Sequence, residues 1–128
     1  LAPWCRRHRR RVHRGCRPLM IARGVQTTNR AIEHIDVEGS TITAEAGVTV
    51  QELQDAAAEV DRLFAPDWGA RGTATLGGAI ATNGGGINVL RYGTTREQVL
   101  GVEVVLADGR IWNGLRALPK DNSGYDLK

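Results

Sequence analysis

The first regular pattern in the chain is residues 31–48, AIEHIDVEGSTITAEAGV, in which apolar and polar residues alternate. Alternation with a period of two predicts strands that have one buried face. The turn residues Glu38, Gly39 and Ser40 divide the stretch in two, so we expect a β-hairpin. The side chains expected on one common side of it are Ile35, Val37, Ile42 and Ala44.

A second alternating stretch covers residues 98–114, QVLGVEVVLADGRIWNG, and predicts another hairpin. Its turn is Asp108-Gly109, a pair that favours a tight connection between antiparallel strands. The first strand alternates, with Glu103 and Val105 expected on one face. The side chains expected on its other face are Val102, Val104 and Leu106.

Between the hairpins the apolar period changes to three and four, which predicts a helix over about residues 50–63. Thr49 and Glu52 have the spacing of a capping box at its start, and Pro66 is expected to end it. Strands that follow one another without an intervening helix favour an α+β domain, with a mixed sheet and flanking helices, over a doubly wound sheet. The recurring apolar positions are Val50, Leu53, Ala57, Val60 and Phe64.

The stretch TLGGAIATNGGG, residues 75–86, holds five glycines among twelve residues. Glycine loses more backbone freedom on folding than other residues, so this density indicates that the backbone approaches a ligand closely. We expect Thr75 to cap a short helix that runs to Ala81 and ends near further glycines. Backbone amides at a helix start bind phosphate readily. The amides expected to be free for an anion are those of Leu76, Gly77 and Gly78.

Two common phosphate-binding loops do not fit this stretch. A P-loop requires lysine after glycine, and no lysine lies between residues 49 and 119. The Rossmann fingerprint requires glycines at its first, third and sixth positions, but counting from Gly84 the sixth position is Val89. The glycine stretch therefore predicts an anion site of another kind.

Charge divides the chain into two parts. Residues 1–30 hold nine arginines and no acidic residue, so residues 31–128 carry eight basic and fourteen acidic residues within an overall net charge of +3. A basic arm can contact phosphates, which makes a nucleic-acid-binding protein an alternative function. Trp4 is the only aromatic residue in the arm, no DNA-reading helix pattern follows, and the remainder is acidic. We therefore expect no nucleic-acid partner.

The arm also contains both cysteines, Cys5 and Cys16, with His8 and His13 between them. These side chains are of the types that bind zinc, but the neighbouring arginines would repel a divalent cation, so we assign no metal site. Residues 31–128 have no cysteine, and no apolar run of the chain is long enough to span a bilayer. A cytoplasmic protein without a transmembrane segment is expected.

Three further motifs accompany the glycine stretch: Asp67-x-Gly-Ala-Arg-Gly, Leu90-Arg-Tyr-Gly and Lys120-Asp-Asn-Ser-Gly-Tyr-Asp-Leu-Lys. With them, residues 29–128 resemble the FAD-binding domain of the p-cresol methylhydroxylase and vanillyl-alcohol oxidase superfamily, in its branch of D-2-hydroxyacid dehydrogenases. That branch includes D-lactate dehydrogenases, the FAD subunit of glycolate oxidase and D-2-hydroxyglutarate dehydrogenases. The motifs most resemble the last group.

The resemblance implies a non-covalently bound FAD that takes a hydride at N5 from a D-2-hydroxyacid, such as 2-hydroxyglutarate, lactate or glycolate, to give the 2-oxoacid. It implies no catalytic base and no metal ligand in this chain. For Tyr92, a place in the core with its hydroxyl paired is an open alternative to flavin contact. The implied cofactor-binding residues are Pro66, Asp67, Gly72, Thr73, Ala74, Thr75, Leu76, Gly77, Gly78, Thr82, Asn83, Gly85, Gly86, Tyr92 and Gly93.

The sequence departs from the family at both ends. Residues 1–28 lack the family's Pro-x-Gly-Gly-x-Thr-Gly loop, so we expect there an unmatched basic arm that is disordered or the product of a shifted reading frame. Residues 29–128 are then a partial FAD-binding domain, because the family continues after Lys128 into a cap domain. The implied partners are FAD and, in the complete enzyme, a small 2-hydroxyacid, with a homodimer left open. A non-functional gene fragment is a further alternative.

Overall fold

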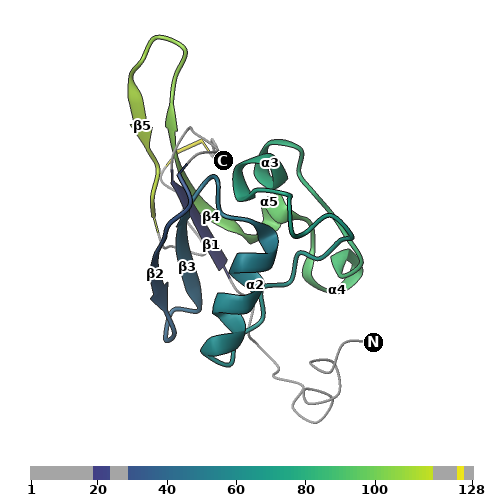
Figure 1. The fold of residues 1–128 in the computed structure, drawn as a ribbon. Coiled ribbons are helices and arrows are strands. Elements are labelled where there is room, and N and C mark those ends of the chain that lie inside the picture. The colour runs from purple at the N-terminus through teal and green to yellow at the C-terminus, as the bar shows by residue number, and fades with distance from the viewer. Residues whose placement is uncertain (1–18, 24–28, 117–123, 126–128) are drawn as a thin grey trace.

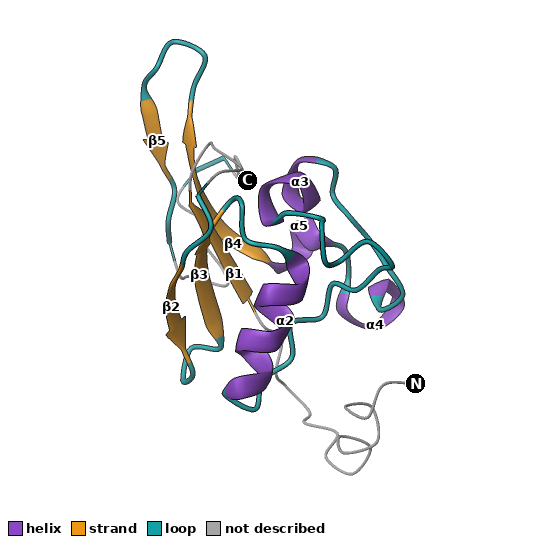
Figure 2. Cartoon of the chain, in the orientation of Figure 1, coloured by secondary structure: helices purple, strands orange, loops and turns teal. Residues whose placement is uncertain are grey.

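The structure, a computed structural model, describes residues 19–23, 29–116 and 124–125. Five strands form one mixed sheet in the order β2-β3-β1-β4-β5. The strands are β1 (Leu19–Arg23), β2 (Ile32–Asp36), β3 (Thr41–Glu45), β4 (Val99–Val105) and β5 (Ile111–Asn113). The helices of the described residues are α2 (Val50–Glu59), α3 (Leu76–Ala81), α4 (Val89–Tyr92) and α5 (Thr95–Gln98). The helices lie to one side of the sheet (Figures 1 and 2), which is the α+β arrangement with a mixed sheet that the sequence predicts.

Both predicted hairpins are confirmed. β2 pairs antiparallel with β3, and β4 pairs antiparallel with β5. Ile42 and Ala44 are buried, whereas Val37, expected on the same side, follows the end of β2 and is 39% exposed. Leu106, expected on the same face as Val102 and Val104, likewise follows the end of β4 and is 41% exposed. The alternating pattern therefore runs one residue further than each strand.

The strand β1 between the two hairpins was not predicted. It pairs in parallel with both β3 and β4, and so joins the hairpins into one sheet. Its residues belong to the segment 1–28 that we assigned to an unmatched arm. For Leu19–Arg23 that boundary is wrong, because these residues form the central strand. The signal was missed because five residues after an arginine-rich run are too few to establish a period.

The helix α2 begins as predicted but ends earlier. The amide of Glu52 donates to Thr49 Oγ1 at 3.2 Å, while the amide of Thr49 donates to Glu52 Oε2 at 2.7 Å, which is the predicted capping box. The helix ends at Glu59 because Asp61 adopts a φ of +57°, a left-handed conformation that commonly terminates helices. The predicted end at residue 63 is therefore wrong. Phe64 still reaches the core, where it is 2% exposed.

The capping box makes stability depend on pH through Glu52. Hydrogen bonds from the backbone N–H and then the hydroxyl of Thr49 hold the pKa of Glu52 below its ordinary value of 4.5. A lowered folded-state pKa gives stability that is present above about pH 4.5 and is lost as the pH falls through the folded-state value. We expect Glu52→Gln, which keeps an acceptor oxygen, to reduce stability at pH 7 by about 0.5 kcal/mol or less, since the carboxylate is exposed.

Urea unfolding of the unmodified chain and of the Glu52→Gln variant between pH 7 and pH 3 checks this prediction. The stability difference between the two should be constant near neutral pH and should shrink below pH 4.5. A difference that stays the same across the whole series would contradict the assignment, because glutamine does not titrate.

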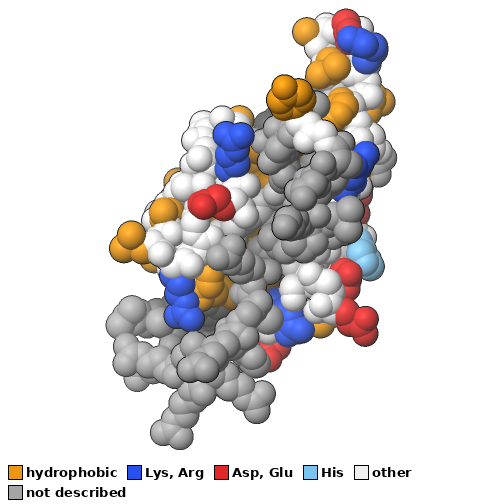
Figure 3. All heavy atoms as spheres, turned by 180° about the vertical axis from the view of Figure 1, so that it is seen from behind, with side chains coloured by type: hydrophobic (Ala, Val, Ile, Leu, Met, Phe, Trp, Pro, Cys, Tyr) orange, Lys and Arg blue, Asp and Glu red, His pale blue; other side chains and the backbone are white. Residues whose placement is uncertain are grey.

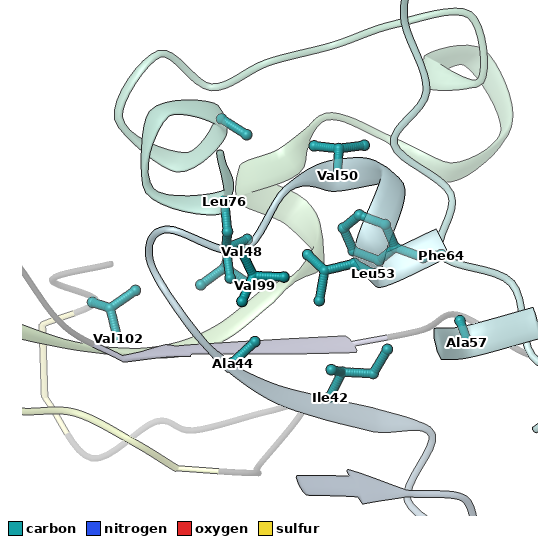
Figure 4. Packing of buried hydrophobic residues seen from close by; sticks show 11 residues of the cluster. Ile42, Ala44, Val48, Val50, Leu53, Ala57, Phe64, Leu76, Val99 and Val102 are labelled. Carbon is teal, nitrogen blue, oxygen red and sulfur yellow. The ribbon is translucent and has the colours of Figure 1, made fainter. Parts of the chain in front are cut away.

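The core lies between the sheet and the helices. Figure 4 shows Ala44 and Ile42 on the sheet, with side chains of α2 and α3 above them. Leu76, the first residue of α3, packs beside Val48 and Val99, and its side chain is fully buried. The core therefore fixes the start of α3 directly over the sheet.

The β4–β5 hairpin projects beyond the rest of the domain (Figure 1). Seen from behind, exposed apolar side chains gather on this projection near an acidic and a basic group (Figure 3). The charged pair is Asp108 and Arg110, joined at 2.6 Å, and the backbone amide of Arg110 is the main cause of a lowered pKa for Asp108. The exposed apolar residues of the hairpin are Val105, Leu106 and Ile111.

Candidate functional site

The glycine stretch begins with α3, whose bounds are those that the sequence predicts. Thr75 is the N-cap, and its hydroxyl accepts a hydrogen bond from the amide of Gly78 at 3.3 Å. The next turn is built from small residues, which let the helix lie close to the loop that precedes α2. A Cβ on Gly77 would lie 3.0 Å from the Cβ of Ala46. The helix therefore starts at a fixed place against its own chain.

The expectation of free amides at this helix start is wrong. The amide of Leu76 donates to Val48 O at 2.7 Å, and the amide of Gly77 donates to Ala46 O at 2.8 Å. The amide of Gly78 is taken by the Thr75 hydroxyl. All three donors are satisfied within the chain, because they attach α3 to the residues before α2. The start of α3 thus offers no ready anion site, in contrast to helix ends whose amides are unpaired.

The glycine stretch instead borders an open hollow of about 270 Å³ beside α3. Small side chains and backbone form most of its wall, and none of the residues that line it is charged. The lining residues are Trp68, Ala74, Thr75, Gly78, Ala79, Thr82, Gly84, Gly85 and Gly86. An uncharged wall of this kind suits a flat or apolar group better than an ion.

Two glycines of the hollow are required by close contacts. Gly86 has a φ of +102°, and a Cβ there would lie 2.2 Å from the carbonyl oxygen of Asp67. The amide of Ile87 donates to that same carbonyl at 3.0 Å. At Gly84 a Cβ would lie 3.0 Å from the indole ring of Trp68. These contacts press the glycine stretch against the segment that follows Phe64.

Buried Thr95 holds the other side of the stretch. Its hydroxyl donates to Gly84 O at 2.6 Å, and its amide donates to the same oxygen at 3.0 Å. The amides of Gly85 and Gly86, by contrast, donate to no acceptor within the described part of the chain. A rigid loop with two unpaired donors beside an uncharged hollow can hydrogen-bond acceptor atoms on the edge of a ligand.

The structure brings together only part of the predicted cofactor-binding set. The members that line the hollow are Ala74, Thr75, Gly78, Thr82, Gly85 and Gly86. Leu76 is buried in the core, and Gly77 packs on Ala46. These two have structural roles that account for their residue types without a ligand.

The remaining predicted residues lie around the hollow and not in its wall. Asp67 pairs with Arg71 at 2.9 Å, and Pro66 O accepts from Gln54 Nε2 at 2.7 Å. Asn83, with a φ of +50°, accepts from the amide of Arg96 at 3.0 Å. The others are Gly72 and Thr73, which are exposed, and Tyr92 and Gly93 at the end of α4.

Tyr92 was predicted either to pack in the core or to contact the flavin. The guanidinium of Arg91 lies over the ring of Tyr92, 5.3 Å from the ring centroid, and the side chain of Tyr92 is half-buried. It belongs neither to the buried core cluster nor to the wall of the hollow. The core alternative is therefore not supported, and flavin contact by Tyr92 stays a prediction.

Sequence reasoning missed Trp68 and Ala79 as parts of the hollow, and it expected Gly84 to let the chain turn around a flat ring without placing it in the cofactor-binding set. Trp68 stands inside the motif Asp67-x-Gly-Ala-Arg-Gly, at the position treated as variable. A tryptophan next to a dense glycine stretch was the available signal, since large aromatic side chains commonly line ligand pockets. Ala79 could have been predicted from the helical spacing of α3, because it stands four residues after Thr75 and therefore lies on the same side of the helix.

Within the described residues we find neither a metal-binding cluster nor a membrane-spanning helix. Among the described residues, no group of three or more His, Cys, Asp or Glu side chains could hold a metal ion. No helix within those residues has the length and apolar composition needed to cross a membrane. The four candidate zinc ligands of the basic arm lie outside the described residues.

Comparison with known proteins places this geometry in a family. Residues 20–114 match the FAD binding domain family, and this stretch contains every residue that lines the hollow. The chain is 49% identical over 100 residues to the mitochondrial D-2-hydroxyglutarate dehydrogenase of Rattus norvegicus, covering 78% of this chain and 18% of the relative. It is 46% identical over 104 residues to the D-lactate dehydrogenase of Archaeoglobus fulgidus, covering 80% of this chain and 23% of the relative.

The chain thus spans about a fifth of the length of the curated relatives it matches. The family match begins at residue 20, which agrees with the place of β1 in the sheet and moves the start of the resemblance earlier than residue 29. It ends at residue 114, one residue after β5. The matched stretch therefore coincides with the whole five-stranded sheet and its helices, and the chain belongs to the family of FAD binding domains.

Proposed function

We propose that the hollow beside α3 holds part of the FAD of a flavin-dependent D-2-hydroxyacid dehydrogenase. The observation that carries the proposal is the position of the uncharged, glycine-lined hollow inside the stretch that matches the FAD binding domain family. The residues proposed to contact the flavin are the six predicted ones that line the hollow: Ala74, Thr75, Gly78, Thr82, Gly85 and Gly86.

The size of the hollow supports a partial contact with the cofactor. Its volume of about 270 Å³ lies just below the range in which pockets enclose a whole small molecule, roughly 300–1,000 Å³. FAD is larger than a typical small ligand, so other contacts are required for the rest of it. The proposal therefore assigns one portion of the dinucleotide to this chain's hollow.

The residues of the wall have defined tasks in this proposal. The Gly85 and Gly86 amides donate to acceptor atoms of the cofactor, and the absence of Cβ atoms lets it approach the backbone. The contacts of Gly84 with Trp68 and Thr95 keep that backbone in place before the cofactor arrives. The bound flavin would supply the acceptor for a hydride from the substrate carbon. No residue that lines the hollow titrates near neutral pH, so we assign no catalytic base to it.

The substrate class rests on the names of the relatives. D-2-hydroxyglutarate dehydrogenases of Rattus norvegicus and of Xanthomonas citri, and a D-lactate dehydrogenase of Archaeoglobus fulgidus, share 44–49% identity with the chain. We propose a D-2-hydroxyacid as substrate of the complete enzyme. The cytoplasmic location and the homodimer stay predictions, and the rat relative carries the word mitochondrial in its name.

Flavin binding by the 128-residue chain tests the proposal. We expect equilibrium dialysis to show retention of FAD with a Kd weaker than about 1 µM, since one hollow contacts only part of the dinucleotide. NAD is the matched control, because it shares the adenine and diphosphate of FAD but has no flavin ring. Failure to retain FAD, or equal retention of NAD, would contradict the proposed function.

Activity is measured after residues 29–116 replace the matching stretch of the rat enzyme, because the chain spans 18% of that relative. The chimera should keep its flavin and its oxidation of D-2-hydroxyglutarate. A folded chimera without flavin would count against the proposal.

A further inference from the structure

The family resemblance implies that Thr82, Gly85 and Gly86 lie near the flavin ring, and these residues line the hollow. We infer that the indole of Trp68, which lines the same hollow, is a further contact surface for this ring. The inference rests on the proposed function and extends it to a residue outside the predicted cofactor-binding set. It assigns to Trp68 a direct role in binding.

The position of Trp68 supports a ligand contact. The side chain lines the hollow together with Gly84 and Gly86, and its ring atoms are the nearest neighbours of a Cβ built at Gly84. The same side chain is half-buried and packs against the core cluster. Trp68 therefore lies at the boundary between the core and the hollow, where part of it is accessible to a ligand.

The polar groups around the ring fit a heteroaromatic ligand. The indole N–H donates to no acceptor within the described residues, and the amides of Gly85 and Gly86 are likewise unpaired there. These are donors only, so they suit a ligand whose edge carries carbonyl oxygens and ring nitrogens. The flavin ring has such an edge and a large face for stacking on tryptophan.

Charge argues against the diphosphate as the occupant. No lysine or arginine lines the hollow, and Arg71, which lies nearby in sequence, is paired with Asp67 at 2.9 Å. The amides at the start of α3 are already bonded within the chain. An anion would thus enter a hollow that has neutral donors but no cation to balance its charge, which is unfavourable compared with its hydration in water.

Packing against the core is the alternative role for Trp68, and a variant of Trp112 separates the two roles. Trp112 lies on β5, is half-buried and also packs against the core, but it does not line the hollow. Trp68→Phe and Trp112→Phe are therefore matched changes in core packing. Only the first removes an indole from the hollow.

The test measures the fluorescence of riboflavin bound to the 128-residue chain and to both variants. Riboflavin carries the flavin ring without a diphosphate or adenine. An indole in van der Waals contact transfers an electron to the excited flavin and quenches its emission, whereas phenylalanine does not. We expect bound riboflavin to be dark in the unmodified chain and in Trp112→Phe, and bright in Trp68→Phe.

Affinity provides a second readout. We expect Trp68→Leu to bind riboflavin about fivefold more weakly, and Trp68→Phe to bind within about twofold of the unmodified chain, because phenylalanine keeps an aromatic face. Inorganic pyrophosphate and adenosine, added in excess, should leave riboflavin bound. Displacement by pyrophosphate would assign the hollow to the diphosphate, displacement by adenosine would assign it to the adenine, and either result overturns the inference.

The outcomes separate this inference from the proposed function. If the unmodified chain retains FAD but bound riboflavin is as bright as free riboflavin, the contact with Trp68 is refuted while the proposed function stands. Equal quenching in Trp68→Phe and Trp112→Phe has the same meaning. If the chain retains neither FAD nor riboflavin, both proposals fail. The first comparison needs no variant, so it does not depend on the folding of Trp68→Phe.

Discussion

Leu76→Ala is expected to lower the free energy of unfolding by about 2–5 kcal/mol, the range for truncating a buried leucine. Leu76 is fully buried beside Val48 and Val99 (Figure 4), so the surrounding side chains leave a cavity when it is shortened. Domains of this size have about 5–15 kcal/mol of stability in total, so the loss is a large fraction. Chemical denaturation followed by circular dichroism measures it.

The change at Leu76 should also weaken flavin binding, although the side chain does not line the hollow. Leu76 anchors the start of α3, and Thr75, Gly78, Ala79 and Thr82, on or beside that helix, line the hollow. Leu90→Ala is the matched control, because it removes the same atoms from a side chain that is fully exposed. We expect less than about 0.5 kcal/mol of change there. Similar losses in both variants would show that α3 is not held by the core.

The elements with a clear period were predictable from the sequence. Hairpin strands, the capped start of α2 and the bounds of α3 each follow from local rules, because Thr49, Thr75 and the alternating residues act on their immediate neighbours. The strand β1 could not be found in this way. It is stabilised by pairing with β3 and β4, which are far away in the chain, and local patterns contain no information on such partners.

The candidate site was predictable in its location but not in its chemistry. The density of glycine predicted that a ligand approaches the backbone of residues 75–86, and this stays a prediction, whereas the close approaches seen at Gly77, Gly84 and Gly86 are to the chain itself. The sequence could not show that Ala46 and Val48 supply the acceptors for the amides of α3, because that pairing depends on how two loops meet. The contacts of Trp68 with Gly84 and Gly86 likewise exist only in the folded chain, although a tryptophan beside the glycine stretch was a signal for a pocket.

Close contacts within the folded chain also explain why so many glycines occur in one stretch. Gly77 is needed for contact with Ala46, Gly84 for contact with Trp68, and Gly86 for contact with Asp67. Three separate close approaches within ten residues thus shape one hollow. The glycines therefore serve the packing of the chain on itself first, and ligand access follows from the space that this packing leaves.

Gly86→Ala is expected to be the most damaging change to the hollow. The backbone conformation at a φ of +102° is strained for any residue with a Cβ, by about 1–3 kcal/mol. In addition the new Cβ would lie 2.2 Å from Asp67 O, which is backbone and cannot move aside as a flexible side chain could. The hydrogen bond from the Ile87 amide to this oxygen should be broken as the two segments separate.

Gly109→Ala is the control that has the backbone strain without the steric clash. Gly109 has a φ of +84°, but a Cβ there would meet nothing within 4 Å, so only the conformational strain of about 1–2 kcal/mol is expected. Gly86→Ala should therefore lose clearly more stability than Gly109→Ala in urea, and should also lose riboflavin binding, which Gly109→Ala keeps. Faster amide hydrogen exchange at Ile87 in the first variant alone would report the separation directly. If both variants lose the same stability and both keep riboflavin, the contact between Gly86 and Asp67 does not form the hollow, and the site proposed here is wrong.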